Sequence, residues 1–292
     1  MTPQYDTATA TAATDTALRA ATAAAFRALH VPGTPLVLPN AWDAVSARLV
    51  ETAGAAAVAT TSAGLAWALG AGDGDRLQRG EALGALTRIA HAVSVPVTAD
   101  IESGYAEGAA GVADTVRAVL AAGAVGVNIE DGLYDGGEPL RPVAEQAERI
   151  AAARGAADAA GVPLFVNARV DTYLRGVGER PDARLALTVE RAAAFLAAGA
   201  DGVFVPGAVD PDTVAALVAR IDGPVNVMAG PGAPPVAELA ALGVARISVG
   251  SGLAQAAHAL VRRAARELLT EGTYGSLADG IDFGEVNQLF GR

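Results

Sequence analysis

Three acidic residues stand at spacings that could bind a metal ion. Asp100 and Glu102 follow one apolar run, and Glu130 ends another. Residues two apart in a strand point the same way, so each run can bring its polar side chains to one place. Carboxylates gathered so closely repel one another unless a cation lies between them. An all-carboxylate set predicts a hard cation, Mg²⁺ or Mn²⁺, although acids in these positions could instead cap the helices that follow.

Arg169 ends a further apolar run and is the natural partner for an anion. A guanidinium binds a carboxylate or a phosphate through two parallel hydrogen bonds. The alternative is that Arg169 neutralises Glu130 or Asp171. Asp43 and Asp131, each taken alone, are better explained as helix caps.

The composition excludes whole classes of chemistry. The 292 residues include no cysteine and no lysine, because all 21 basic residues are arginine. Disulfides, thiolate metal sites and Schiff-base lysines are therefore impossible. His30, His91 and His258 are expected to be helix or surface residues rather than general bases.

Charge and hydropathy indicate a soluble protein. The net charge of −11 argues against binding to nucleic acid. No apolar run is long enough to cross a membrane, and the N-terminus lacks the layout of a signal peptide. We therefore expect a cytoplasmic protein that binds neither nucleic acid nor membrane.

An internal repeat predicts the fold. Apolar runs open with proline at positions 35, 96, 163 and 224, and with glycine at 54, 123, 199 and 243. The two types alternate, and alanine-rich helical stretches such as 108–122, 141–160 and 184–198 lie between them. Eight buried strands separated by helices predict an α/β protein, a (β/α)8 TIM barrel. A doubly wound open sheet is the alternative, but no Gly-x-Gly-x-x-Gly turn follows the first run.

The repeat also suggests a domain organisation. Residues 1–17 are predicted to be a flexible arm, and residues 18–270 the catalytic barrel, with 251–270 as its last helix. Residues 271–292 carry enough apolar side chains to dock on the barrel or on a neighbouring subunit, but not to fold alone.

The active site of such a barrel is built at the carboxyl ends of its strands. The segments expected there are 40–43, 60–65, 100–105, 128–131, 167–171, 206–207, 226–228 and 248–251. Asn226 is among them and is a candidate for contact with the substrate.

Several of these segments match one known family, in order and correctly spaced. The runs are Pro39-Asn-Ala-Trp-Asp43, Ser62-Ala-Gly-Leu-Ala66, Ala99-Asp-Ile-Glu-Ser-Gly-Tyr105, Gly126-Val-Asn-Ile-Glu-Asp131 and Asn167-Ala-Arg-Val-Asp171. They resemble the isocitrate lyase/phosphoenolpyruvate mutase superfamily over roughly residues 35–270. The resemblance implies a Mg²⁺-dependent enzyme that cleaves or forms C–C or P–C bonds beside a carboxylate, through an enolate-like intermediate.

The resemblance also assigns roles to residues. It implies that Asp100, Glu102 and Glu130 hold the metal, partly through waters, and that Arg169 binds the substrate carboxylate or assists the charge. Backbone N–H groups of Ser62, Ala63, Gly64 and Leu65 would meet a 2-oxo acid, with Trp42 packed nearby and Asp73 as a mobile acid close to the metal. The family's lid corresponds to residues 132–139.

Departures from the family pattern narrow the activity. Lyases of isocitrate and methylisocitrate carry a Lys-Lys-Cys-Gly lid, and phosphoenolpyruvate mutases a strand-end histidine where Pro206 stands here. A C–C lyase or decarboxylase acting on a small 2-oxo or 2-hydroxy acid remains the first hypothesis. Its proton donor would be Tyr134, with Tyr105, Asp135, Glu138 or a metal-bound water as alternatives. A P–C enzyme and a non-catalytic metabolite-binding barrel are the other hypotheses.

The family also suggests an assembly. Its members are commonly tetramers that exchange the last helix between neighbours. A homo-oligomer, tetramer or dimer, is therefore expected, with a last helix that closes its own barrel as the alternative.

Overall fold

The computed structural model describes residues 6–291, in which nine parallel strand segments form one sheet. The strands are β1 (Leu36–Leu38), β2 (Asn40–Ala41), β3 (Val58–Thr60), β4 (Val97–Asp100), β5 (Gly126–Glu130), β6 (Phe165–Arg169), β7 (Gly202–Phe204), β8 (Val225–Met228) and β9 (Arg246–Ser248). The sheet runs in the order β1-β9-β8-β7-β6-β5-β4-β3-β2.

A proline divides the first strand of the barrel into two segments. β1 pairs with β9 and β2 pairs with β3, and only Pro39 separates β1 from β2 in the chain. Proline has no N–H to donate to a strand ladder, so the break falls at this residue. Together the two segments act as one strand that joins both ends of the sheet. The predicted (β/α)8 barrel is confirmed.

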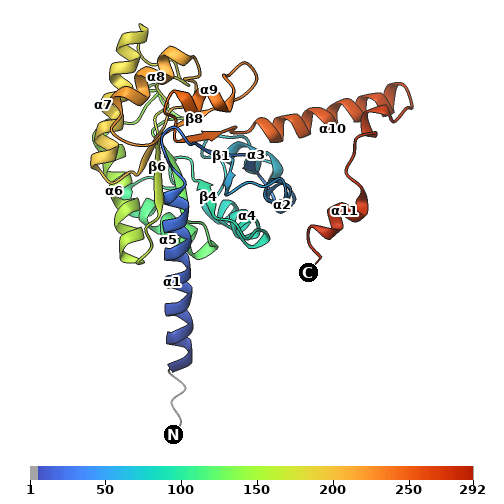
Figure 1. Cartoon of the computed structure of the whole chain (residues 1–292), viewed down its shortest axis with the longest axis horizontal. Coiled ribbons are helices and arrows are strands. Elements are labelled where there is room, and N and C mark those ends of the chain that lie inside the picture. The colour runs from blue at the N-terminus through green and yellow to red at the C-terminus, as the bar shows by residue number, and fades with distance from the viewer. Residues whose placement is uncertain (1–5, 292) are drawn as a thin grey trace.

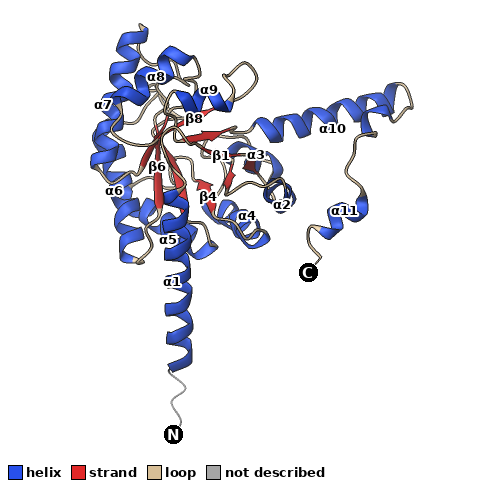
Figure 2. Ribbon diagram, viewed as in Figure 1, coloured by secondary structure: helices blue, strands red, loops and turns tan. Residues whose placement is uncertain are grey.

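Helices surround the barrel, as Figure 2 shows. The helices of the described chain are α1 (Asp6–Ala28), α2 (Ala44–Thr52), α3 (Ser62–Ala68), α4 (Arg79–Ala92), α5 (Ala109–Ala122), α6 (Val143–Ala159), α7 (Pro181–Ala197), α8 (Pro211–Arg220), α9 (Val236–Ala241), α10 (Gly252–Thr270), the 3₁₀ turn η1 (Gly275–Leu277) and α11 (Phe283–Gln288). The predicted helical stretches 108–122, 141–160 and 184–198 correspond to α5, α6 and α7. None of the helices in the described residues is long and apolar enough to cross a membrane.

The two ends of the chain extend away from the barrel (Figure 1). Helix α1 includes residues 6–17, where the sequence suggested a flexible arm, and residues 1–5 lie outside the described part. Helix α10 projects outward instead of closing its own barrel, and only Ala254 in it is buried. The tail returns to its own subunit, because Arg48 Nε donates a 2.8 Å hydrogen bond to the carbonyl of Leu289.

The barrel interior contains a polar layer. Asn167 donates hydrogen bonds to Asn128 at 2.9 Å and Asn226 at 3.1 Å, and Arg246 donates to Asn128 at 3.2 Å. Alternate strand residues point inward, which brings these four side chains to one level. The outward-facing residues of the strands pack with the helices into a single apolar core.

His30 is buried beneath this layer and follows the end of α1, whereas the sequence suggested a helix or surface residue. Its ring stacks on Phe165 with centroids 3.8 Å apart, and its Nδ1 lies 3.0 Å from the carbonyl of Phe26. Burial and the charge of Arg246 lower the pKa of His30 from 6.5 to about 3. The histidine is therefore neutral in the folded protein at any pH near neutrality.

His30 should make the protein sensitive to acid. The unfolded chain takes up a proton at His30 below about pH 6.5 and the folded chain does not, so stability is lost as pH falls through that value. Below that pH, the free energy of unfolding of the wild type should fall by about 1.4 kcal/mol more per pH unit than that of His30→Phe, a variant that keeps a ring against Phe165. Urea unfolding at pH 7, 6 and 5 measures this difference. The control is His91→Phe at an exposed position, which should keep the wild-type slope of unfolding free energy against pH. Equal slopes for wild type and His30→Phe would contradict the expectation.

Candidate active site and metal centre

A cavity of about 190 Å³ opens at the carboxyl ends of the strands. Residues at the strand ends and in the loops that follow them form its wall, as expected for the active end of such a barrel. Its lining residues are Asn40, Thr61, Ser62, Ala63, Asp73, Asp100, Asn128, Arg169, Leu174, Phe204, Pro206, Met228, Ser248, Gly250 and Ser251.

Asp100, the last residue of β4, is the acid at the centre of the site. Its Oδ2 accepts hydrogen bonds from the hydroxyl of Ser62 at 2.9 Å and from the Ser62 backbone N–H at 3.2 Å. Its Oδ1 is buried and has no hydrogen-bond partner among the described residues. The charge of Asp100 also contributes to raised pKa values at Glu102, Glu130 and Asp73.

Glu102 lies beside Asp100 in an unusual backbone conformation. Its φ is 50°, in the left-handed region that costs a side-chain-bearing residue energy and is often found at functional sites. Its Oε2 accepts a hydrogen bond from the backbone N–H of Asp75, whereas its buried Oε1 has no such partner in residues 6–291. Burial, together with the charges of Asp100 and Asp75, raises the pKa of Glu102 to about 7.

Glu130 and Arg169 form a buried ion pair at the ends of β5 and β6. Arg169 Nη1 lies 2.5 Å from Glu130 Oε2, and its Nε and Nη2 donate to both oxygens of Asp171 at 2.6 and 3.0 Å. Arg169 thus pairs with both acids as well as lining the cavity. Burial lowers its pKa, but the charges of Glu130 and Asp171 outweigh burial and hold that pKa well above its ordinary value. Burial also raises the pKa of Glu130.

The three predicted ligands fit a cation. Asp100 and Glu102 each keep one buried carboxylate oxygen without a hydrogen-bond partner in the described chain, and Glu130 keeps two, of which Oε2 forms the ion pair with Arg169. A buried oxygen of this kind is costly unless a donor or a cation satisfies it. Among residues 6–291, however, no three acidic or histidine side chains lie close enough to hold one ion between them as they stand. The arrangement therefore fits an ion bound partly through water, which is usual for Mg²⁺.

The segment 62–65 forms the first turn of α3. The first turn of a helix leaves its N–H groups without partners inside the helix. The N–H of Ser62 is used by Asp100, and that of Leu65 by the carbonyl of Thr61 at 3.0 Å. Ala63 lines the cavity, and its N–H and that of Gly64 are positioned for an anion at the helix N-terminus. Leu65 itself is buried in the core.

Trp42 lies behind this turn, not in the cavity wall. A Cβ placed on Gly64 would come within 2.9 Å of the Cβ of Trp42 and 3.2 Å of that of Ala254. Only glycine allows so close an approach. Trp42 thus supports the turn on which Ala63 is carried.

Asp73 and the lid residue Tyr134 approach the acids from two loops. Asp73 Oδ1 accepts a 3.3 Å hydrogen bond from the Ser62 hydroxyl, and burial and the charge of Asp100 raise the pKa of Asp73. The charge of Glu130 acts on the hydroxyl of Tyr134 and, with burial, raises its pKa. The Tyr134 ring packs so closely on Gly74 that a Cβ there would lie 2.5 Å from it, which links the two loops.

Other sequence expectations fall outside the cavity. Asn226 is buried one layer below it, where its amide nitrogen donates to the carbonyls of Val227 at 2.8 Å and Arg246 at 3.1 Å. Asp43 caps α2 as expected. Asp131 is not a helix cap: it pairs with Arg191 at 2.6 Å and accepts the N–H of Asp171.

The sequence assigned no role to other residues of the cavity wall, although all of them except Leu174 and Phe204 lie in the segments expected at the strand ends. They are Asn40, Thr61, Asn128, Leu174, Phe204, Met228, Ser248, Gly250 and Ser251. Most follow directly from strand ends, so their positions were available from the repeat, but their residue types carry no signal of chemistry.

Comparison with known proteins finds relatives over most of the chain. An uncharacterized protein of Mycobacterium tuberculosis is 42% identical over 239 residues, which cover 80% of this chain and 86% of that protein. The 2-methylisocitrate lyase of Escherichia coli is 32% identical over 185 residues, covering 62% of this chain and 60% of the lyase.

Solved structures are similar over nearly the whole chain. A candidate lyase/mutase from Burkholderia cenocepacia is 41% identical, with a TM-score of 0.86 over 94% of this chain and 97% of that one. A phosphonopyruvate hydrolase in complex with oxalate and Mg²⁺ is 28% identical, with a TM-score of 0.79 over 92% of this chain and 95% of the hydrolase.

The family model described as phosphoenolpyruvate phosphomutase matches residues 26–269. Enzymes of the matched superfamily act on C–C or P–C bonds. The chain belongs to this family, within the isocitrate lyase/phosphoenolpyruvate mutase superfamily.

Proposed function

We propose that this chain is a Mg²⁺-dependent enzyme that cleaves a C–C bond of a small 2-oxo or 2-hydroxy carboxylic acid. The observation that carries the proposal is the set of buried carboxylate oxygens on Asp100, Glu102 and Glu130 that lack hydrogen-bond partners in the described chain. The oxalate and Mg²⁺ bound to the related phosphonopyruvate hydrolase support both the metal and a small acid as ligand.

Each part of the site has a chemical task in this proposal. Mg²⁺ bound among the acids would stabilise negative charge that develops on the substrate's oxygens. The N–H groups of Ala63 and Gly64 would bind and orient the substrate's oxygens at the N-terminus of α3. Arg169, already held in place by Glu130 and Asp171, keeps a fixed positive charge at the same wall.

Tyr134 is the proposed proton donor. Burial and the charge of Glu130 raise the pKa of its hydroxyl, so Tyr134 keeps its proton at neutral pH. The segment 132–139 brings this hydroxyl close enough to the acid cluster for the charge of Glu130 to act on it. Closure of the lid would also exclude water from the reacting carbon.

A P–C enzyme is the second candidate, because the matching family model is that of a phosphomutase. The first test is a panel of 2-oxo and 2-hydroxy acids incubated with Mg²⁺ and read by mass spectrometry, with phosphonopyruvate and phosphoenolpyruvate followed by ³¹P NMR. Cleavage of a carboxylic acid that stops in EDTA supports the C–C reaction. Turnover that persists in EDTA, or conversion of the phosphonate alone, would overturn it.

Removing the central acid should abolish the reaction. Asp100→Ala is expected to lower turnover by about 10²-fold or more, because the metal loses a ligand and the negative charge loses its counter-ion. Isothermal titration should show weaker Mg²⁺ binding in the same variant. Asp114→Asn, a change at an exposed acid on α5, is the control and should behave like wild type.

Removing the lid hydroxyl should slow the chemical step. Tyr134→Phe keeps the ring that packs on Gly74 but has no proton to donate, so we expect kcat to fall about 10²-fold or more. Binding of oxalate and Mg²⁺ should be nearly unchanged. An unaltered kcat would assign the proton to Tyr105, another lid residue or water.

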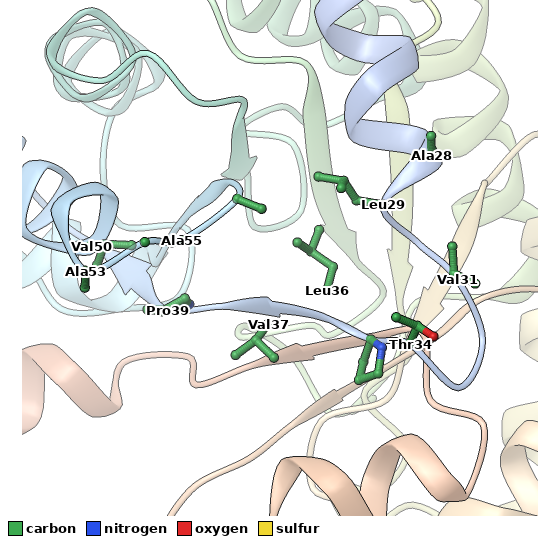
Figure 3. Close-up of a pocket in the computed structure, with 13 residues that line it drawn as sticks. Ala28, Leu29, Val31, Thr34, Leu36, Val37, Pro39, Val50, Ala53 and Ala55 are labelled. Carbon is green, nitrogen blue, oxygen red and sulfur yellow. The ribbon is translucent and has the colours of Figure 1, made fainter.

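We also propose that α10 packs on a neighbouring copy of the chain. Its exposed apolar side chains include Leu253, Leu260 and Leu268, at spacings that place them along one side of the helix. The wall of the barrel that α10 leaves uncovered carries an apolar groove of about 550 Å³, in which Figure 3 shows Leu29, Leu36 and Val37. Val37 on β1 is 39% exposed, which is unusual for a barrel strand.

A charge placed on the apolar side of α10 tests whether this helix packs on a neighbouring copy. Leu260→Glu should weaken assembly by about tenfold or more, because a charge would be buried where a leucine contributes about 1.5–3 kcal/mol. Size-exclusion chromatography with light scattering measures the mass. Gln255→Glu adds the same charge at another exposed position of α10 and is the control. A wild-type monomer would contradict the assembly.

A further inference from the structure

The cavity at the mouth of the barrel has two chemically different walls. One wall carries the charged and polar groups of the site, including Asp100, Ser62 and Arg169. The other consists of apolar side chains from the strand ends and loops after β6, β7 and β8: Leu174, Phe204, Pro206 and Met228. The metal chemistry described above uses only the first wall.

The barrel topology places Asp100 and Met228 on opposite sides of the cavity, with Arg169 on β6 beside Phe204 on β7. β4, which ends in Asp100, and β8, which ends in Met228, lie four strands apart in a barrel of eight. Strands in these positions face each other across the barrel axis. A ligand whose head lies at Asp100 therefore extends toward Met228.

The apolar wall is held in place by its neighbours. A Cβ on Gly250 would lie 2.6 Å from Met228 Sδ, so the backbone at Gly250 packs directly against the methionine. Phe204 is 5% exposed, and its ring centroid lies 6.0 Å from the Cζ of Arg169. These contacts leave Phe204 and Met228 little freedom to move away from a ligand.

A second anionic group would find no free cation at this wall. Arg169 is the only cation among the described residues that line the cavity, and its nitrogens are paired with Glu130 and Asp171. Arg246 lies deeper and does not line the cavity; one of its nitrogens donates to Asn128, and its Nε and Nη1 have no hydrogen-bond partner among the described residues. A carboxylate or phosphonate placed against Phe204 and Met228 would lose its water without a compensating charge.

We infer that the substrate has one anionic end only. A 2-oxo or 2-hydroxy carboxylate lies at the wall of Asp100 and Ser62, and an uncharged, largely apolar group lies against Phe204, Pro206 and Met228. The inference rests on the proposed function for the anionic end and adds the chemistry of the other. It separates this chain from enzymes whose substrates carry a second carboxylate or a phosphonate at that position.

Two acids of equal length provide the test. 2-Oxopentanoate and 2-oxoglutarate differ only in a terminal methyl against a terminal carboxylate, and oxalate represents the anionic end alone. Isothermal titration with Mg²⁺ should give a dissociation constant for 2-oxopentanoate at least about tenfold lower than for 2-oxoglutarate, because only the methyl matches the apolar wall.

A charge placed in the wall should reverse the preference. Met228→Arg is expected to bind 2-oxoglutarate more tightly than 2-oxopentanoate, since the guanidinium supplies the missing cation. Met228→Leu keeps an apolar side chain of similar volume and should keep the wild-type order. If circular dichroism shows that Met228→Arg does not fold, the ratio of the two dissociation constants for the wild type alone tests the inference.

The outcomes separate the two claims. If oxalate with Mg²⁺ does not bind to wild type, the proposed function fails and the inference fails with it. If oxalate binds but 2-oxoglutarate binds as tightly as 2-oxopentanoate, or more tightly, the inference is overturned and the proposed function stands. Oxalate binding together with a clear preference for 2-oxopentanoate supports both.

Discussion

Repulsion between buried carboxylates is the constraint on which the rest of this structure depends. Glu102 and Glu130 are buried at one end of the barrel beside the partly buried Asp100, whose charge makes ionisation of the other two harder. The single guanidinium of Arg169 is shared between Glu130 and Asp171, which leaves the charge of the cluster uncompensated. The divalent cation proposed above would compensate this charge.

The surroundings of the cluster hold it against that repulsion. The loop that carries Glu102 is fixed from behind by Arg149, which donates hydrogen bonds to the carbonyls of Ser103 and Ala106 at 2.6 Å and of Glu107 at 2.8 Å. Three bonds from one buried guanidinium keep the left-handed backbone at Glu102 in place. The acids form a site because the backbone holds them close together, not because of their residue types alone.

The fold and the location of the site could be predicted from sequence because the barrel permits few alternatives. Once proline-led and glycine-led runs alternate eight times, parallel strands must bring Asp100, Glu130 and Arg169 to one rim. Depth within the barrel is a different matter. Asn226 has the inward parity of a site residue but lies one layer below the cavity, where amide partners rather than a ligand satisfy it. Parity along a strand does not encode depth when neighbouring strands are staggered.

Features that depend on packing between distant segments could not be predicted either. Phe204 lies outside the segments expected at the mouth of the barrel, and the apolar side chain of Met228, which lies within one of them, gives no sign that it faces the acids. The direction of α10 likewise depends on contacts rather than on its pattern, which is that of any barrel helix. Its only buried residue, Ala254, packs on Gly64, which in turn packs on Trp42. None of these three positions has space to spare. The same contact therefore determines the direction in which α10 leaves the barrel and the shape of the turn at Ala63.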